Sequence, residues 1–83
     1  MPKVEIRFVT AGLTPGLKNG EYVVPESTSV RDLIAICEKK CGHTVPEDSY
    51  KMMHPIFNGK SISLDEIIES DGTLHICRLA VGG

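Results

Sequence analysis

The sequence lacks the long apolar run of a membrane-spanning helix, since no stretch approaches roughly 18 consecutive apolar side chains. It also lacks a basic stripe, because the formal charge is −2 and adjacent bases such as Lys39 and Lys40 stand alone. The polar start, residues 1–7, does not have the pattern of a secretory signal peptide. These absences argue against a membrane partner, a nucleic-acid partner and a secretory route.

The short chain sets a second limit. A single domain commonly has about 50 to 250 residues, so we expect the 83 residues to form one domain. A chain of this size buries only about 60% of the surface that its unfolded form exposes. We therefore expect one compact core without a deep active-site cleft, and a role other than that of an enzyme.

Cysteine is scarce, and its number is odd. Cys37, Cys41 and Cys77 cannot all pair within one chain, so free thiols in the reducing cytosol, with the nucleus as a second compartment, are expected. Cys37, Cys41 and His43 could suggest a metal or thiol site, but zinc needs four ligands, or three and a water. Free cysteine is among the most buried residue types, so we expect Cys37 and Cys41 in the core, and neither a metal nor another cofactor.

Alternation of apolar and polar side chains predicts the strands. Residues 4–8 alternate in this way, and the Gly-, Pro- and Asn-rich segment 11–20 predicts a hairpin connection to a second short strand at 22–24. A third strand is predicted at 50–57 and a last one at 73–77.

Helix signals occupy the middle of the chain. Ser29, with Asp32 three residues on, predicts the start of a helix over 30–41 that Gly42 ends. One helical stripe holds the apolar residues Val30, Leu33, Ile34, Cys37 and Cys41. A second capping pattern predicts one further helical turn over 63–68.

The predicted order is strand, strand, helix, strand, helical turn, strand. A hairpin, one crossover helix and two further strands can bury one helix stripe against one sheet face. This predicts an α+β fold of β-grasp type, a mixed four- to five-stranded sheet packed on one helix, with parallel, neighbouring first and last strands. We expect residues 1–78 to form this domain and residues 79–83 to form a flexible tail.

Two segments carry a resemblance to a known family. Residues 72–76, Gly-Thr-Leu-His-Ile, and residues 56–60, Ile-Phe-Asn-Gly-Lys, resemble segments of ubiquitin and its relatives, and Gly82-Gly83 falls the same distance beyond. The resemblance implies a ubiquitin-like modifier: an activating enzyme adenylates the terminal carboxylate with ATP, passes it to a cysteine as a thioester, and a target lysine attacks. It also implies a monomer whose partners are activating and conjugating enzymes, a processing protease and target lysines.

The tail supplies the residues to which the resemblance assigns roles. Gly82 and Gly83 are the expected conjugation residues, and Leu79, Ala80 and Val81 stand where ubiquitin's activating enzyme reads a partly basic tail. This departure implies recognition by a dedicated activating enzyme. The apolar tail also resembles the β-grasp sulfur carriers of thiamine and molybdopterin synthesis, in which the carboxylate becomes a thiocarboxylate. A third possibility is a binding module that only shares the fold.

The resemblance also points to surface residues. Ile56, His75 and Cys77 match the face of ubiquitin that receptors bind, although ordinary sheet surface explains single apolar residues equally well. Lys60 matches a chain-forming lysine of ubiquitin, whereas a solvated lysine is the simpler interpretation. The acidic residues of segment 65–71 are explained by helix capping and solvation.

Overall fold

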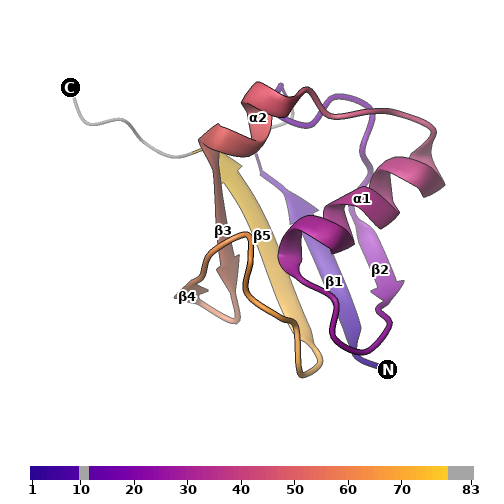
Figure 1. Ribbon diagram of the computed structural model, residues 1–83, viewed down its shortest axis with the longest axis vertical. Helices are drawn as coiled ribbons and strands as arrows, with labels where there is room; N and C mark the ends of the chain where they lie inside the picture. The colour runs from indigo at the N-terminus through magenta and orange to yellow at the C-terminus, as the bar shows by residue number, and fades with distance from the viewer. Residues whose placement is uncertain (10–11, 79–83) are drawn as a thin grey trace.

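The computed structural model describes residues 1–9 and 12–78, and Figure 1 shows helix α1 lying across one face of a twisted sheet. Along the chain the elements are β1 (Lys3–Phe8), β2 (Gly20–Val23), α1 (Val30–Cys41), α2 (Glu47–Met52), β3 (Met53–Phe57), β4 (Lys60–Ser61) and β5 (Gly72–Arg78). The five strands lie in the order β2-β1-β5-β3-β4, and β1 is parallel to β5 and antiparallel to β2. The predicted β-grasp architecture is confirmed.

The core lies between α1 and the inner face of the sheet. Ile6 of β1 is the register partner of Leu74 of β5, and Phe8 is the partner of Ile76, so apolar side chains of the two strands stand side by side. Ile6 and Leu74 are fully buried. The alternation along both strands therefore directs one set of side chains into the core and leaves the other set on the outer face.

Helix α1 begins and ends as predicted. The Ser29 hydroxyl accepts a hydrogen bond from the Asp32 N–H at 3.1 Å, which satisfies one of the first-turn donors. At the other end Gly42 has a φ of 70°, and its N–H donates to the Glu38 carbonyl. The buried residues of the stripe are Val30, Leu33, Ile34 and Cys37, while Cys41 is only partly buried.

The third strand is shorter than predicted. The prediction of a strand from Tyr50 onward is wrong, because α2 covers residues 47–52 and β3 begins at Met53. Two acidic residues in the first turn of α2 favour the helix through its dipole. A tertiary hydrogen bond also holds α2 in place: the hydroxyl of the buried Tyr50 donates to Glu38 Oε1 of α1 at 2.9 Å. Burial and this hydrogen bond both raise the pKa of Tyr50, so the hydroxyl remains a donor at neutral pH.

The helical turn predicted over 63–68 is present only at its start and does not reach residue 68. Only one turn forms there, with the Glu66 N–H donating to the Ser63 carbonyl at 3.2 Å, and the chain then runs extended. The carbonyls that a helix would use are taken by the start of α1, where the Val30 N–H donates to Glu66 and the Arg31 N–H to Leu64. The first N–H groups of any helix lack a partner within that helix, so this segment caps α1 rather than forming its own helix.

The β3–β4 hairpin turns where the sequence predicts it. Asn58 and Gly59 have φ values of 51° and 80°, the conformation of a two-residue hairpin turn. Pro55 lies within β3 without breaking it. The Pro55 carbonyl accepts a hydrogen bond from the Ile62 N–H, so this carbonyl points away from β5. The proline nitrogen, which carries no hydrogen, faces the same side, where the short β4 ends.

We expect Leu33→Ala to lower the free energy of unfolding by about 2–5 kcal/mol, through lost burial and a residual cavity. Leu33 is fully buried at the centre of the α1 stripe. Denaturant titration measures this loss, and Lys39→Ala on the exposed side of α1 is the matched control, expected to change stability by less than about 0.5 kcal/mol. A loss at Leu33 no larger than that of the control would contradict the packing described here.

Candidate functional site

Strand β5 leads to the segment that the sequence marks as reactive. This strand lies in the middle of the sheet, between β1 and β3. Its pairing with β3 extends as far as Arg78, whose register partner is Met53. The remaining five residues, the predicted conjugation residues Gly82 and Gly83 and the predicted recognition residues Leu79, Ala80 and Val81, lie outside the described residues. The tail therefore starts from the end of a strand that β3 holds as far as Arg78, whereas the pairing with β1 ends at Ile76.

The predicted partner surface lies on the outer face of the sheet, away from α1. Ile56 and His75 are register partners on β3 and β5, and Cys77 is the partner of His54 one step further along. All four side chains are half-buried. Pro55 does not shift the register, because it pairs with Ile76 in a continuous ladder. The structure thus brings Ile56, His75 and Cys77 together, and their binding role stays a prediction.

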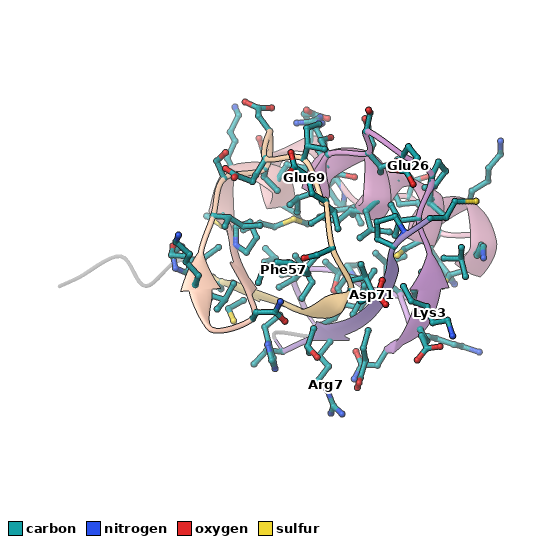
Figure 2. The ribbon with its side chains drawn as sticks, turned by 90° about the horizontal axis from the view of Figure 1, so that it is seen from below. Lys3, Arg7, Glu26, Phe57, Glu69 and Asp71 are labelled. Atoms are coloured by element: carbon teal, nitrogen blue, oxygen red, sulfur yellow. The ribbon has the colours of Figure 1, made fainter. Side chains whose placement is uncertain are left out.

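The sequence interpretation missed several members of this face. His54 belongs to it, and its Nε2 lies 3.1 Å from the Ser61 hydroxyl of β4. Arg7 of β1 is the register partner of His75 and points away from the core on the side opposite α1, as Figure 2 shows. Strict alternation around Ile56 would have identified His54, and the parallel β1–β5 pairing would have identified Arg7.

His54 and Ser61 raise the question of a catalytic pair on this face. A hydroxyl activated by a histidine needs a third group that orients the imidazole. Within residues 1–9 and 12–78, no carboxylate forms a hydrogen bond with His54, and Ser61 is exposed. Ile56 has polar groups around it on this face, and recognition by a partner stays a prediction.

Lys60 does not belong to this face. It is the register partner of Phe57, which alternates with Ile56 and therefore points to the other side of the hairpin. The side chain of Lys60 is exposed. Its predicted role as a chain-forming lysine is thus separate in space from the patch around Ile56.

The thiols show no shared site. Burial raises the pKa of Cys37 to about 12, which keeps this thiol protonated and unreactive at neutral pH. Cys41 Sγ lies 3.8 Å from the Tyr22 hydroxyl, and Cys77 is on the outer face. In the described part of the chain, no cluster of His, Cys, Asp or Glu side chains is arranged to hold a metal ion, and no helix is long and apolar enough to cross a membrane.

Comparisons with known proteins identify the fold. No protein-family model and no curated protein sequence matches the chain. A candidate molybdopterin converting factor subunit 1 from Pyrococcus furiosus matches with a TM-score of 0.67 and 19% identity, over 96% of this chain and 100% of that chain. Small archaeal modifier protein 1 from Haloferax volcanii matches in two crystal structures. One has a TM-score of 0.70 and 15% identity over 96% and 100% of the chains, and the other 0.69 and 17% over 98% and 99%.

These matches cover nearly the whole length of both partners in each comparison. At such low sequence identity they define the architecture, and they agree with the strand order and the parallel β1–β5 pairing. The chain has the ubiquitin-like β-grasp fold.

If Ile56 anchors a receptor, Ile56→Ala should leave the fold intact and weaken receptor binding at least about fivefold, because truncating an interface anchor costs more than about 1 kcal/mol. Titration of the purified variant against an isolated receptor measures the effect. Met52→Ala is the matched control, since Met52 is an exposed apolar residue, 41% accessible, at the end of α2 and outside the outer sheet face. Equal receptor affinity of the two variants would reduce Ile56 to ordinary sheet surface.

Proposed function

We propose that this chain is a ubiquitin-like protein modifier whose Gly83 carboxylate is activated by adenylation and joined to lysines of target proteins. In this proposal a dedicated activating enzyme and a conjugating enzyme handle the chain, and a processing protease exposes Gly83 wherever a precursor extends beyond it. The modifier acts as a monomer in the cytosol or nucleus, independently of membranes and nucleic acids. It is the substrate and the tag rather than the catalyst.

One observation carries the proposal: the sequence continues from Arg78, the end of the central strand of a ubiquitin-like fold, for five residues to Gly82-Gly83. The pairing of β5 with β3 as far as Arg78 gives the tail a fixed starting point, so an enzyme that binds the domain also fixes where the tail begins. The names of two similar structures, small archaeal modifier protein 1, support the modifier role.

The chemistry explains why glycine ends the tail. A Gly83 carboxylate oxygen attacks the α-phosphorus of ATP, pyrophosphate leaves, and an acyl adenylate forms. An enzyme thiolate then attacks the acyl carbon and AMP leaves, and finally a lysine amine displaces the thiolate to give an isopeptide bond. The tail must thread a narrow channel to reach the nucleotide, and glycine has no Cβ to obstruct it and adopts any φ that the path needs.

A sulfur carrier is the second candidate function. The name of the Pyrococcus furiosus structure and the apolar residues Leu79, Ala80 and Val81 favour it. Both functions begin with the same acyl adenylate, and they diverge in the nucleophile that finally receives the acyl group. An amine gives an isopeptide conjugate, whereas a sulfur donor gives a thiocarboxylate.

We expect Gly83→Val to abolish conjugate formation and ATP–pyrophosphate exchange while leaving the melting temperature nearly unchanged. A branched side chain moves or obstructs the carboxylate, and a misplacement of about 1 Å can cost on the order of a hundredfold in rate. Gly12→Val is the matched control, because a Cβ at Gly12 meets no atom within 4 Å, and it should retain exchange activity. A Gly83→Val protein that still forms conjugates would overturn the proposal.

Intact mass separates the two candidate functions. A modifier forms covalent conjugates, which persist in denaturing gels as a ladder of higher-mass species. A sulfur carrier remains a free chain whose mass is higher by the difference between one sulfur and one oxygen atom. Loss of both species in Gly83→Val would confirm that the tail is activated, and the species present in the wild type would assign the function.

Leu79 tests the dedicated-enzyme claim separately. We expect the wild-type chain to be a poor substrate of ubiquitin's activating enzyme, and Leu79→Arg to improve the cross-reaction. An acidic pocket built for arginine is left with an unpaired charge when leucine occupies it. Thioester formation with that enzyme measures the effect, and Leu79→Gln, similar in size but uncharged, is the control. Ready charging of the wild-type chain would contradict the claim.

A further inference from the structure

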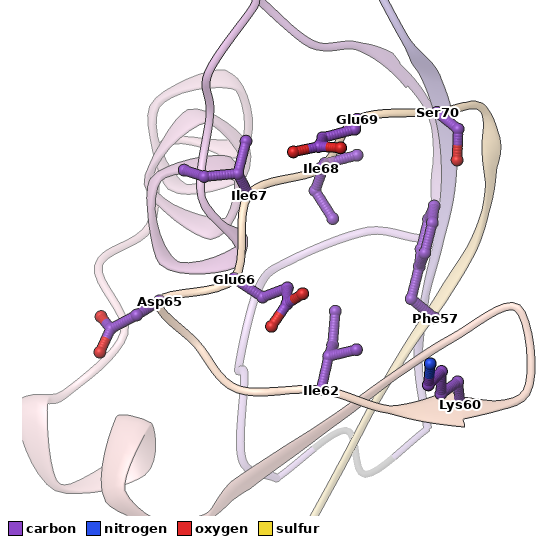
Figure 3. A pocket seen from close by; sticks show the side chains of 9 residues that line it. All are labelled: Phe57, Lys60, Ile62, Asp65, Glu66, Ile67, Ile68, Glu69 and Ser70. Atoms are coloured by element: carbon purple, nitrogen blue, oxygen red, sulfur yellow. The ribbon is translucent and has the colours of Figure 1, made fainter.

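A hollow of about 500 Å³ opens between the β3–β4 hairpin and the segment 62–70, on the side of β3 opposite to Ile56. Figure 3 shows Ile62 and Ile68 pointing toward each other across it, with the Phe57 ring forming one side. Phe57 and Ile62 are half-buried and pack against the core, and Ile68 is 2% exposed. We call this hollow the hairpin groove; its apolar residues pack on the folded core, and polar and charged residues complete its lining.

Carboxylates stand inside and around the apolar walls. In Figure 3 the Glu66 carboxylate lies between the two isoleucines and Glu69 lies beside Ile68, whereas Asp65 points away. Among the described residues, neither Glu66 nor Glu69 has an ion-pair partner. Lys60 is the one cation in the lining, against these carboxylates. The hairpin groove therefore combines an apolar base with more acidic than basic side chains in its lining.

The groove is formed before any ligand arrives. Its outer wall, the segment 62–70, is tied to the start of α1 by three backbone hydrogen bonds, including the Ile68 N–H to the Thr28 carbonyl at 2.9 Å. Its other wall is tied to β5, where the Thr73 N–H donates to Asn58 Oδ1 at 2.9 Å. A ligand therefore does not have to order these walls, which lowers the entropic cost of binding.

We propose that the hairpin groove binds an arginine side chain presented next to apolar residues by a partner protein. The guanidinium adds positive charge to a groove in which acidic side chains outnumber the single cation Lys60, and its forked donors suit two separate carboxylates, Glu66 and Glu69. A guanidinium also stacks on an aromatic face, which Phe57 supplies, while the aliphatic stem of arginine contacts Ile62 and Ile68. Lysine carries its charge on a compact ammonium group without a planar face, so we expect it to stack on the Phe57 ring less favourably than arginine.

This surface is independent of the proposed activation chemistry. The hairpin groove and the outer sheet face lie on opposite sides of β3, because Phe57 and Ile56 are adjacent in the strand and point to opposite sides. One partner can therefore hold the outer face while another occupies the groove. Binding to the groove requires neither Gly83 nor ATP, so its test can fail while the modifier proposal stands.

The test is a titration of the whole chain with a blocked peptide, acetyl-Gly-Leu-Arg-Leu-Gly-amide, followed by the NMR signals of Ile62, Ile68 and Phe57. The same peptide with citrulline in place of arginine keeps the shape and removes the charge. We expect the arginine peptide to shift these signals and to bind at least about tenfold more tightly than the citrulline peptide, since hydrogen bonds to ionised groups are roughly twice as strong as neutral ones.

Charge variants locate the site. The double substitution Glu66→Gln with Glu69→Gln should weaken the arginine peptide about tenfold. Glu21→Gln with Asp48→Asn removes the same charge from exposed positions outside the groove and should change the affinity less than about twofold. Phe57→Leu tests stacking on its own and should weaken binding about threefold. An unchanged amide spectrum confirms that each variant is folded.

Four results would overturn the proposal. Equal binding of the citrulline peptide would remove the need for a cation, and an equal loss in the control double variant would assign the effect to net charge alone. Binding of free L-arginine as tightly as the peptide would assign the groove to a free amino acid. Shifts of the groove signals with protein concentration alone would show that a second copy of the chain occupies it.

Discussion

The parallel pairing of β1 with β5 is the interaction on which the rest of the structure depends. It joins segments far apart in sequence, since Val4 is the register partner of Gly72, and closing so long a loop carries an entropic cost. The burial of Ile6 and Leu74 between the two strands and α1 offsets this cost. Strand β2 then pairs with β1, and the β3–β4 hairpin pairs with β5 through β3, so both halves of the sheet attach to this central pair.

The same pairing determines what the outer face and the tail can do. Because β5 is held on both sides, His75 and Cys77 have fixed neighbours, namely Arg7 on β1 and His54 and Ile56 on β3. A recognition surface needs such fixed neighbours, since groups that must be ordered on binding reduce the affinity. The base of the tail at Arg78 is positioned by the same ladder. The outer face and the tail therefore share one rigid strand.

The sequence predicts those elements whose signals are local. Helix α1 follows from the Ser29 cap, the apolar stripe and Gly42, and all three signals agree with the way in which α1 packs. Tyr50 and the later part of the segment 63–68 were misassigned because tertiary hydrogen bonds decide their conformation: Tyr50 bonds to Glu38 on α1, and the carbonyls of 64 and 66 accept from the start of α1. Local patterns do not contain these partners.

The two surfaces differ in how far the sequence could reveal them. Alternation and the family resemblance together place Ile56, His75 and Cys77 on one face, and the register confirms that placement. The hairpin groove is made entirely of residues within 57–70, and it forms only because the segment after the β3–β4 hairpin lies across from Phe57 in the fold. The acidic side chains of its lining look in sequence like ordinary capping and solvated residues, so only the folded loop shows that they stand over an apolar hollow.

The register of β3 keeps the two surfaces distinct. A slip of one residue would move Ile56 into the groove and Phe57 onto the outer face, because side chains alternate along a strand. Asn58 opposes such a slip: it donates its N–H to the Thr73 carbonyl at 3.0 Å and accepts the Thr73 N–H on its side chain. The Asn58 amide fits only because residue 72 is glycine, where a Cβ would lie 2.4 Å from Oδ1. Gly72 thus permits the contact that fixes which side of the hairpin each surface occupies.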